Sequence, residues 1–472
     1  MHKLLVLAVL ALGSRAYADR KAADQLAAEA RRDPTKLDAC GAAYLEVYNR
    51  DPTARDNDEV LAAAASCFHD AHSVSAELQT YAVLAKYYPS SKLGSRATRA
   101  SAHAYAQIAQ YDRAAELLET YAMKYANERD AGDALLQAIA YRAALGDTAS
   151  QIEYTHRFTK AFAFKQRAAA AAAEFALGSV YDGDDAIKHL RMFVARYAQA
   201  EPELAGLAYA RLGDLLWTRS CPVRATDGLC LAITRQRADH CGAPELMKVV
   251  AVARTADARV ALEQYRNAGV ALAKAPPSAR GRHAAAMAQL ALADAELETL
   301  LRASFPKDLD LDPAPAHHAS REHSFATFVR WVADETKLTT TASQAYERVL
   351  DLKDLDASVA AASRIGEAAQ AFWRALLVGE IPRAILHGDF AKDKRAAYCS
   401  ELRRVAEPIA ERAVEAFRTC LTKSSELGGG LAWANLCERE GHALAPEQFP
   451  IGHELVGPLQ SFTPIAVEPA LP

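Results

Sequence analysis

The sequence predicts an all-α protein, in which helix-turn-helix pairs coil into a superhelix and are followed by a further helical bundle or degenerate repeats. Alanine, the strongest helix former, occupies 105 of the 472 positions, against only 22 glycines and 19 prolines. Apolar residues make up 51% of the chain and aromatic residues 8%, which excludes a disordered protein. Aromatic side chains also recur at intervals that match the length of one helix pair.

Residues 1–18 have the features of a secretory signal peptide. Lys3 precedes an apolar run over residues 4–12, and the small-residue pattern Ala16-Tyr17-Ala18 precedes Asp19. The run is too short to cross a membrane, and no later stretch is apolar enough to do so. We therefore expect export across the inner membrane to the periplasm, with no transmembrane segment in the mature chain. Peripheral attachment to the outer membrane is left open.

Helix pairs are predicted over residues 19–217. The aromatic residues Tyr44, Tyr81, Tyr121, Tyr154 and Phe193 lead the second helices of successive pairs, at separations of 37, 40, 33 and 39 residues. Alanine-rich segments precede four of them and are predicted as first helices, because small side chains let helices pack closely. These segments are residues 61–67, 97–108, 134–144 and 168–177.

This pattern resembles the tetratricopeptide repeat family. The resemblance rests on Ala102 to Tyr105, the turn Gln110-Tyr111-Asp112, the pair Ala114-Ala115 and the ladder Leu118, Tyr121 and Tyr125. The chain departs from the family in its wider period and in Gln110, which replaces the glycine between the helices. The resemblance implies a right-handed superhelix with a concave groove that binds peptides or partner domains. In that reading, the first helices would line the groove with His103, Gln107, Gln137 and Tyr141.

Three further regions are expected after the repeats. Residues 218–246 are predicted as a cysteine-containing loop insertion, 247–444 as a C-terminal helical region and 445–472 as an extended tail with six prolines. The helices expected in the C-terminal region cover 249–273, 283–301, 325–332, 342–350, 358–378 and 398–427. Pro408 lies inside the last of these and predicts a kink or a helix boundary.

All eight cysteines follow the predicted cleavage site, and an even number in an oxidising compartment favours disulfides. Antiparallel helices place residues side by side when these are equidistant from the connecting turn. Cys40 and Cys67 flank the turn 51–56 in this way, and Cys420 and Cys437 flank Gly428-Gly429-Gly430, so both pairs are predicted bridges.

The pairing of the other four cysteines stays open at this stage. Cys221, Cys230 and Cys241 allow one internal pair, with the remaining thiol joined to a partner elsewhere such as Cys399. A zinc site that uses His240 would lack the close cysteine spacing of structural zinc sites, so no metal is predicted there.

Three clusters could carry chemistry, and none matches a catalytic pattern. Asp308, Asp310 and Asp312 precede His317, His318 and His323 without the spacing of a calcium-binding loop. Cys67, His69 and His72 would point to different faces of a helix, and Glu407 and Glu411 form a pair typical of solvated helix surface. The sequence also contains no G-x-S-x-G, H-E-x-x-H or phosphate-loop motif. We therefore predict no catalytic residue, cofactor or metal ligand.

The order of segments along the chain resembles that of a second, narrower group of proteins. The loop elements Cys221-Pro222-Val223, Asp227-Gly228-Leu229-Cys230 and Cys241-Gly242 look like those of exported envelope tetratricopeptide proteins of myxobacteria. So do the closing segments Leu436-Cys437-Glu438-Arg439-Glu440 and Glu447-Gln448-Phe449-Pro450. Several of those proteins are linked to gliding motility, so the resemblance implies a scaffold within a cell-envelope machine.

The sequence favours a non-enzymatic periplasmic scaffold or adaptor, which binds other envelope proteins through its repeat groove and C-terminal tail. Its formal charge of −4, from 55 basic and 59 acidic residues, gives no basic footprint for nucleic acid. One alternative is an assembly factor for outer-membrane proteins. Another is a helical hydrolase or lyase acting on the cell wall, for which Glu407 and Glu411 are the carboxylates to test.

Peptide mapping of the exported protein without reduction tests the cysteine prediction. We expect Cys40 to be recovered with Cys67 and Cys420 with Cys437, because each pair is equidistant from its turn. A reduced and alkylated sample is the control, and recovery of these four thiols in free form would contradict the hairpin argument.

Overall fold

The computed structural model describes residues 19–234, 239–243, 246 and 248–450. The predicted signal peptide and residues 451–472 of the predicted tail lie outside the described residues. The chain divides into two compact units, residues 1–182 and 183–472. The region boundaries predicted at 217, 246 and 444 stay predictions.

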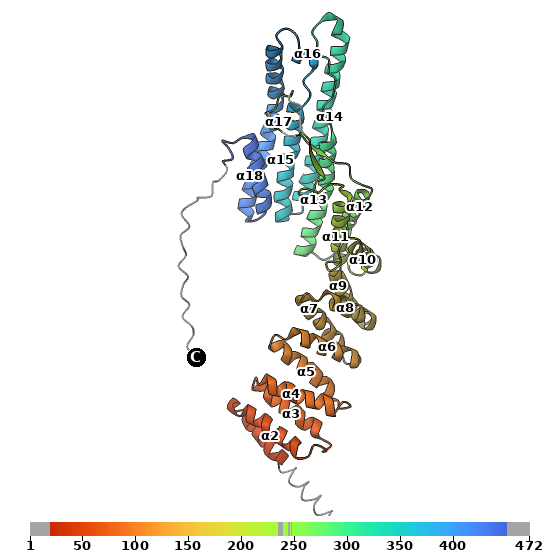
Figure 1. Ribbon diagram of the computed structural model, residues 1–472, viewed down its shortest axis with the longest axis vertical. Coiled ribbons are helices and arrows are strands. Elements are labelled where there is room, and N and C mark those ends of the chain that lie inside the picture. The colour runs from red at the N-terminus through yellow and green to blue at the C-terminus, as the bar shows by residue number, and fades with distance from the viewer. Residues whose placement is uncertain (1–18, 235–238, 244–245, 247, 451–472) are drawn as a thin grey trace, which may run out of the picture. The chain divides into compact units, whose positions relative to one another are not determined.

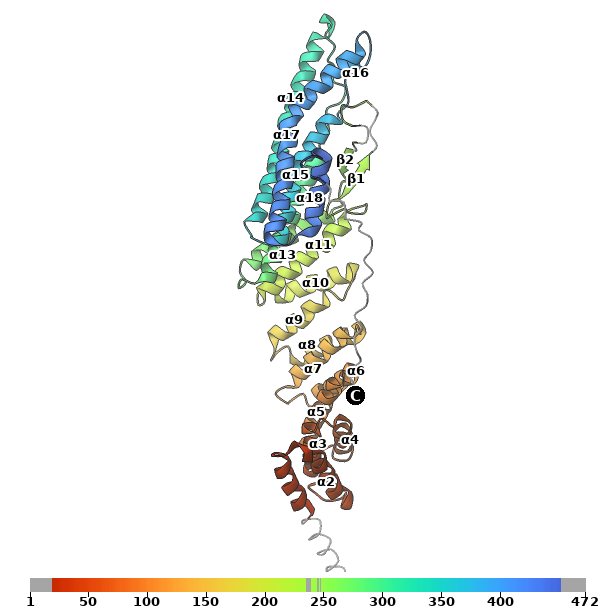
Figure 2. The same cartoon turned by 90° about the vertical axis from the view of Figure 1, so that its left-hand side faces the viewer.

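The first unit is a series of short helices in which each helix packs against the next along the chain (Figures 1 and 2). A helix over residues 19–30 comes first. It is followed by η1 (Pro34–Lys36), α2 (Leu37–Arg50), α3 (Asn57–Asp70), α4 (Val74–Tyr87), α5 (Leu93–Gln107), α6 (Tyr111–Lys124), α7 (Ala131–Ala144), α8 (Thr148–Phe162) and α9 (Arg167–Leu177).

Small and aromatic residues alternate in the core of the first unit, as the sequence predicts. The alanine-rich segments form α3, α5, α7 and α9, and the aromatic ladder lies on the helices between them. Tyr121 and Phe158 are buried among Ala102, Ala134 and Ala138. Burial of a large aromatic side chain against small ones stabilises a helix pair mainly through the apolar area removed from water. Cys40 and Cys67 are joined in a disulfide that links α2 to α3.

The second unit combines a helix hairpin, a small β-hairpin and a bundle of long helices (Figure 1). The helices are α10 (Gly183–Tyr197), α11 (Pro202–Ser220), α12 (Asp257–Leu272), α13 (Ala279–Arg302), α14 (His318–Leu350), α15 (Leu355–Leu377), α16 (Arg383–Leu386), α17 (Ala391–Leu427) and α18 (Leu431–Leu444), with η2 (Pro315–His317) before α14. Strands β1 (Leu231–Thr234) and β2 (Lys248–Ala251) pair antiparallel, with Leu231 opposite Ala251.

Two details of the C-terminal prediction are wrong. The helix predicted over 249–273 begins only at Asp257, because the preceding residues form strand β2. The two helices predicted over 325–332 and 342–350 are one continuous helix, α14. Of the two outcomes predicted at Pro408, the helix boundary is excluded, because α17 runs through this residue, and the kink stays a prediction. The long face of α17 packs against α15.

A three-glycine turn joins α17 to α18. Gly428 and Gly430 both have a φ of 69°, which other residues rarely adopt. A side chain at Gly430 would also meet Val359 of α15 at 2.8 Å. The turn therefore lets α18 fold back onto α15 and α17, where a disulfide joins Cys420 to Cys437.

The insertion between α11 and α12 is organised around a tight turn at Asp227-Gly228. Both residues have positive φ, 49° and 86°, and Thr226 and Leu229 exchange two backbone hydrogen bonds of 2.9 Å across them. Asp-Gly is the residue pair that this type of hairpin turn favours. A disulfide joins Cys221 to Cys230 around the turn, and a second joins Cys241 to Cys399 of α17.

Two buried arginines hold this turn against the helices. Arg254 donates to the carbonyl of Gly228 at 2.9 Å, and Arg364 of α15 donates to the carbonyl of Asp227. Arg254 also stacks on Trp217 of α11, 3.6 Å from the ring centre, and donates to the Trp217 carbonyl at 2.6 Å. The insertion is thus fixed to α11 by one guanidinium and to α15 by the other.

Each arginine has a buried acidic partner on α13. Arg254 pairs with Glu298 at 2.6 Å, where both side chains are at most 4% exposed, and Glu298 also accepts the backbone N–H of Cys230 at 2.8 Å. Arg364 lies 3.3 Å from Asp294, which accepts a 2.7 Å hydrogen bond from the Tyr346 hydroxyl. Arg254 is the one close cation of Glu298, so its removal leaves that carboxylate buried without a close partner, whereas Arg364 also pairs with Glu367 at 2.6 Å.

We expect Arg254→Met to lower the free energy of unfolding of the second unit by about 3–5 kcal/mol, because Glu298 would be left buried without its cation. The double variant Arg254→Met/Glu298→Gln should regain part of this loss, since glutamine still accepts from Cys230. All four tryptophans (Trp217, Trp331, Trp373, Trp433) lie in this unit, so urea unfolding followed by their fluorescence measures it.

Arg302 provides the matched control, because it lies 3.9 Å from the same carboxylate but is 40% exposed. Arg302→Met should change stability by well under 1 kcal/mol. An equal loss in the two single arginine variants would contradict the role assigned to Arg254.

Candidate functional site

The four predicted groove residues lie on the first helices α5 and α7. His103, Gln107 and Gln137 are exposed, and Tyr141 is half-buried. Gln137 donates to the Tyr141 hydroxyl at 2.8 Å, and the Tyr141 ring lies 5.2 Å from that of Tyr111. His103 instead faces His69 of α3, with 6.3 Å between the ring centres. The four residues therefore form two separate groups, one on α5 with α3 and one on α7 with α6.

Only His103 lines the open hollow of about 500 Å³ beside α5. Its other lining residues include Lys92, Arg96 and Arg99, which with His103 follow one face of the helix at intervals of four, three and four residues. Arg99 is paired with Asp130, which also accepts a 2.6 Å hydrogen bond from Tyr121. Lys92 and Arg96 form no ion pair with the described part of the chain. Glu128 and Asp130 also line the hollow, so its basic groups outnumber its acidic ones by a small margin.

A buried carboxyl lies next to this face. Glu77 of α4 is 2% exposed, and its Oε1 lies 3.1 Å from Nδ1 of His69. Burial raises the pKa of Glu77, against the lowering effect of His69 and, further away, of His103. Cys67, which the sequence placed beside His69 as a possible thiol, is bound in the disulfide with Cys40 and has no free sulfur. The cluster of Cys67, His69 and His72 is therefore not a nucleophilic site.

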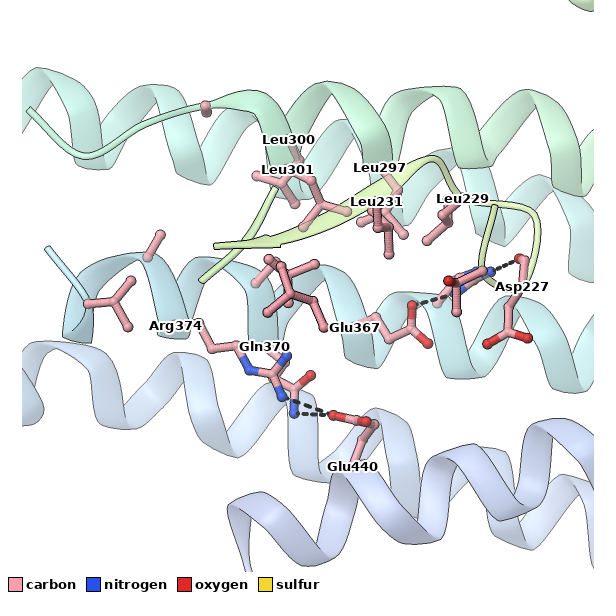
Figure 3. Close-up of a pocket in the computed structure, with 18 of the residues that line it drawn as sticks. Asp227, Leu229, Leu231, Leu297, Leu300, Leu301, Glu367, Gln370, Arg374 and Glu440 are labelled. Atoms are coloured by element: carbon pink, nitrogen blue, oxygen red, sulfur yellow. Dashed lines mark hydrogen bonds and ion pairs between the residues drawn. The ribbon is translucent and has the colours of Figure 1, made fainter. Parts of the chain in front are cut away.

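The second unit contains a cavity of about 400 Å³ between the β-hairpin, α13, α15 and α18 (Figure 3). One wall is apolar and comes from α13 and the insertion: Leu229, Leu231, Val249, Leu297, Leu300 and Leu301. The opposite wall carries a polar stripe from α15, in which Arg364, Glu367, Gln370 and Arg374 recur every three or four residues. Figure 3 shows the leucines on one side and this stripe on the other.

The polar stripe is tied to α18 through Glu440. This carboxylate accepts from Arg374 at 3.0 Å and from Gln370 at 3.1 Å, and it lies 3.4 Å from Arg439. Glu367 pairs with Arg364 at 2.6 Å, and burial raises the pKa of Glu367 although Arg364 opposes the shift. Nε of Arg374 is buried and has no hydrogen-bond partner among the described residues.

Glu335 of α14 is a further buried carboxyl that lines the cavity. Burial raises its pKa to about 7, and Asp334 adds to the shift. Sequence reasoning missed this cavity, because its walls come from segments far apart in the chain. The one signal available was the polar stripe on an otherwise alanine-rich helix.

The other predicted clusters lie outside the two hollows. Asp310 accepts from His317 at 2.7 Å and from the backbone N–H of Asp312 at 3.1 Å, which lowers the pKa of Asp310 to about 2 and raises that of His317. Glu407 and Glu411 are exposed on α17 and do not line the cavity. In the described ranges, no three His, Cys, Asp or Glu side chains are placed to hold a metal ion.

None of the helices in the described residues is long and apolar enough to cross a membrane.

Comparisons with known proteins give little further guidance. No family model matches the sequence, and no curated protein matches it. Among the solved structures that match is one titled "Structure of Naa15/Naa10 bound to HypK-THB", which is 15% identical with a TM-score of 0.30. The match covers 88% of this chain and 52% of that one, so this chain spans about half its length. A TM-score this low establishes neither a shared fold nor a shared function.

We expect Glu335→Gln to become more stabilising as the pH rises. A carboxyl whose pKa is higher in the folded than in the unfolded protein loses folding free energy as the pH climbs from its ordinary pKa of 4.5 to about 7. Glutamine does not titrate, so the stability advantage of Glu335→Gln over the native protein should grow by about 3 kcal/mol between pH 4.5 and pH 8. Urea unfolding at the two pH values, followed by tryptophan fluorescence, measures this difference.

Glu347→Gln is the control, because Glu347 is exposed on the same helix. A difference between Glu335→Gln and the native protein that is the same at both pH values would contradict the assigned burial effect.

Proposed function

We propose that this chain is a non-enzymatic scaffold of the cell envelope, whose first unit binds partner proteins along the exposed faces of its first helices. The observation that carries the proposal is the row Lys92, Arg96, Arg99 and His103 on α5, two of whose members have no acidic partner in the described residues. A solvated basic row beside an open hollow fits an acidic segment of another protein.

The second group extends this surface toward α7. Gln137 and Tyr141 provide an amide, a hydroxyl and an aromatic ring on the next first helix. Tyrosine and arginine are the residue types that most often dominate binding energy at protein interfaces. In this proposal, α5 attracts the acidic partner segment by its positive charge, and α7 contacts the partner through a polar aromatic side chain.

The proposed compartment is the periplasm. The signal-peptide pattern at residues 1–18 supports export, and the four disulfides favour an oxidising environment. Membership of a gliding-motility machine, and a contribution of the C-terminal tail to binding, rest on sequence resemblance and on composition. They belong to the same proposal, and the identity of the captured partner tests membership of such a machine.

Crosslinking in the source cells tests the proposal directly. A photoreactive amino acid at Gln137 should capture one or a few envelope proteins, whereas the same group at His156, exposed on the second helix α8, should not. Capture from His156 alone would place the binding surface elsewhere.

Charge reversal then tests the chemistry of the contact. The double variant Arg96→Glu/His103→Glu should reduce recovery of the captured partner at least about tenfold, because like charges placed opposite an acidic segment repel it. Lys160→Glu, on the exposed surface of α8, is the matched control and should leave recovery unchanged. Equal recovery with both variants would remove the basic row from the interface.

A further inference from the structure

The cavity of the second unit has no part in the proposed scaffold function, which uses the first unit. Its volume of about 400 Å³ lies within the range of about 300–1,000 Å³ that small-molecule sites occupy. Its two walls differ in character, since one is made of leucines and the other of charged and amide groups (Figure 3). A site of this kind suits a ligand with an apolar body and one polar end.

The apolar wall is preformed. Leu297 and Leu300 of α13 are at most 3% exposed and belong to one core cluster with Tyr346 and Val349 of α14. Leu229 and Leu231 come from the insertion, which the two disulfides and Arg254 hold in place. A hydrocarbon chain that lies along this wall replaces water without a rearrangement of the helices.

The polar end carries an excess of positive charge. Arg374 and Arg439 share the single carboxylate Glu440, which leaves one guanidinium charge without its own counter-ion. The buried Nε of Arg374 is a donor that the described residues do not satisfy, and such an atom favours an acceptor from a ligand.

Three guanidinium groups and four carboxyls line the whole cavity, so an anion is favoured only beside Arg374 and Arg439. Arg364 is paired with Glu367 and Asp294, and Asp227 is exposed in its turn. Glu335 is the remaining carboxyl, and it takes up its proton as the pH falls below about 7.

We propose that this cavity binds a single-chain amphiphile with a carboxylate head, its alkyl chain along Leu231, Leu297 and Leu300 and its head at Arg374. Such a ligand has one carboxylate group at the end of an unbranched alkyl chain. A free fatty acid has this chemistry, whether it is taken up directly or released from a lipid by hydrolysis. Probes with the same chain and a neutral or cationic head group test whether the carboxylate is required.

The test measures binding of dodecanoate to the full mature chain. Binding is followed by isothermal titration calorimetry at dodecanoate concentrations below the critical micelle concentration. We expect one site per chain, with 1-dodecanol at least about tenfold weaker and dodecyltrimethylammonium weaker still, because a charge-assisted hydrogen bond is lost in each. Equal binding of all three probes, or no saturable binding of dodecanoate, would overturn the proposal.

Two substitutions locate the site. Ala371→Phe places a ring in the cavity and should weaken dodecanoate at least about tenfold, while Ala397→Phe on the exposed surface of α17 should not. Arg374→Gln should weaken dodecanoate about tenfold and leave 1-dodecanol unchanged, a split that a merely destabilised protein would not give. Should Ala371→Phe fail to fold, Ala375→Leu fills the same cavity with less bulk. Unchanged dodecanoate binding in the folded filling variant and in Arg374→Gln would place the probe elsewhere and refute the assignment.

Discussion

Two guanidinium groups on one β-turn determine how the second unit is built. Arg254 and Arg364 bind the carbonyls of Gly228 and Asp227. Glu298 of α13 neutralises Arg254, and Glu367 of α15 together with Asp294 of α13 neutralises Arg364. These contacts, two disulfides and the burial of Leu229 in the core fix the insertion to the helices. Because the insertion forms one wall of the cavity, the shape of the cavity follows from the same contacts.

The parts of the fold that the sequence predicted are those set by local periodicity. Tyr44 and Tyr121 lie buried on second helices because an aromatic ring fills the seam left by alanines three and four residues apart. The pair Cys420 and Cys437 followed from the glycine turn between them. Strand β2 was assigned to a helix, because Val249 and Val250 have no helical breaker after them and their partner strand is seventeen residues earlier in the chain.

The same distinction between local periodicity and tertiary packing applies to the candidate sites. Exposure of His103, Gln107 and Gln137 could be predicted, since a helix in an array buries one face and solvates the other. The cavity could not, because its walls meet only after α13, α15, α18 and the insertion have packed. A buried pair such as Arg254 and Glu298, 44 residues apart, has no periodic signature at all. Sequence periodicity thus identifies faces of helices, and tertiary packing decides which faces enclose a space.

The connectivity of the four disulfides bears on the order in which they can form. Each joins a cysteine to the next cysteine along the chain: Cys40 to Cys67, Cys221 to Cys230, Cys241 to Cys399 and Cys420 to Cys437. Eight cysteines allow 105 connectivities, and this one is the sequential arrangement. A chain that emerges from its N-terminus into an oxidant can therefore pair every thiol with the first one to follow it. In that order of pairing, no non-native disulfide has to be broken on the way to the native set.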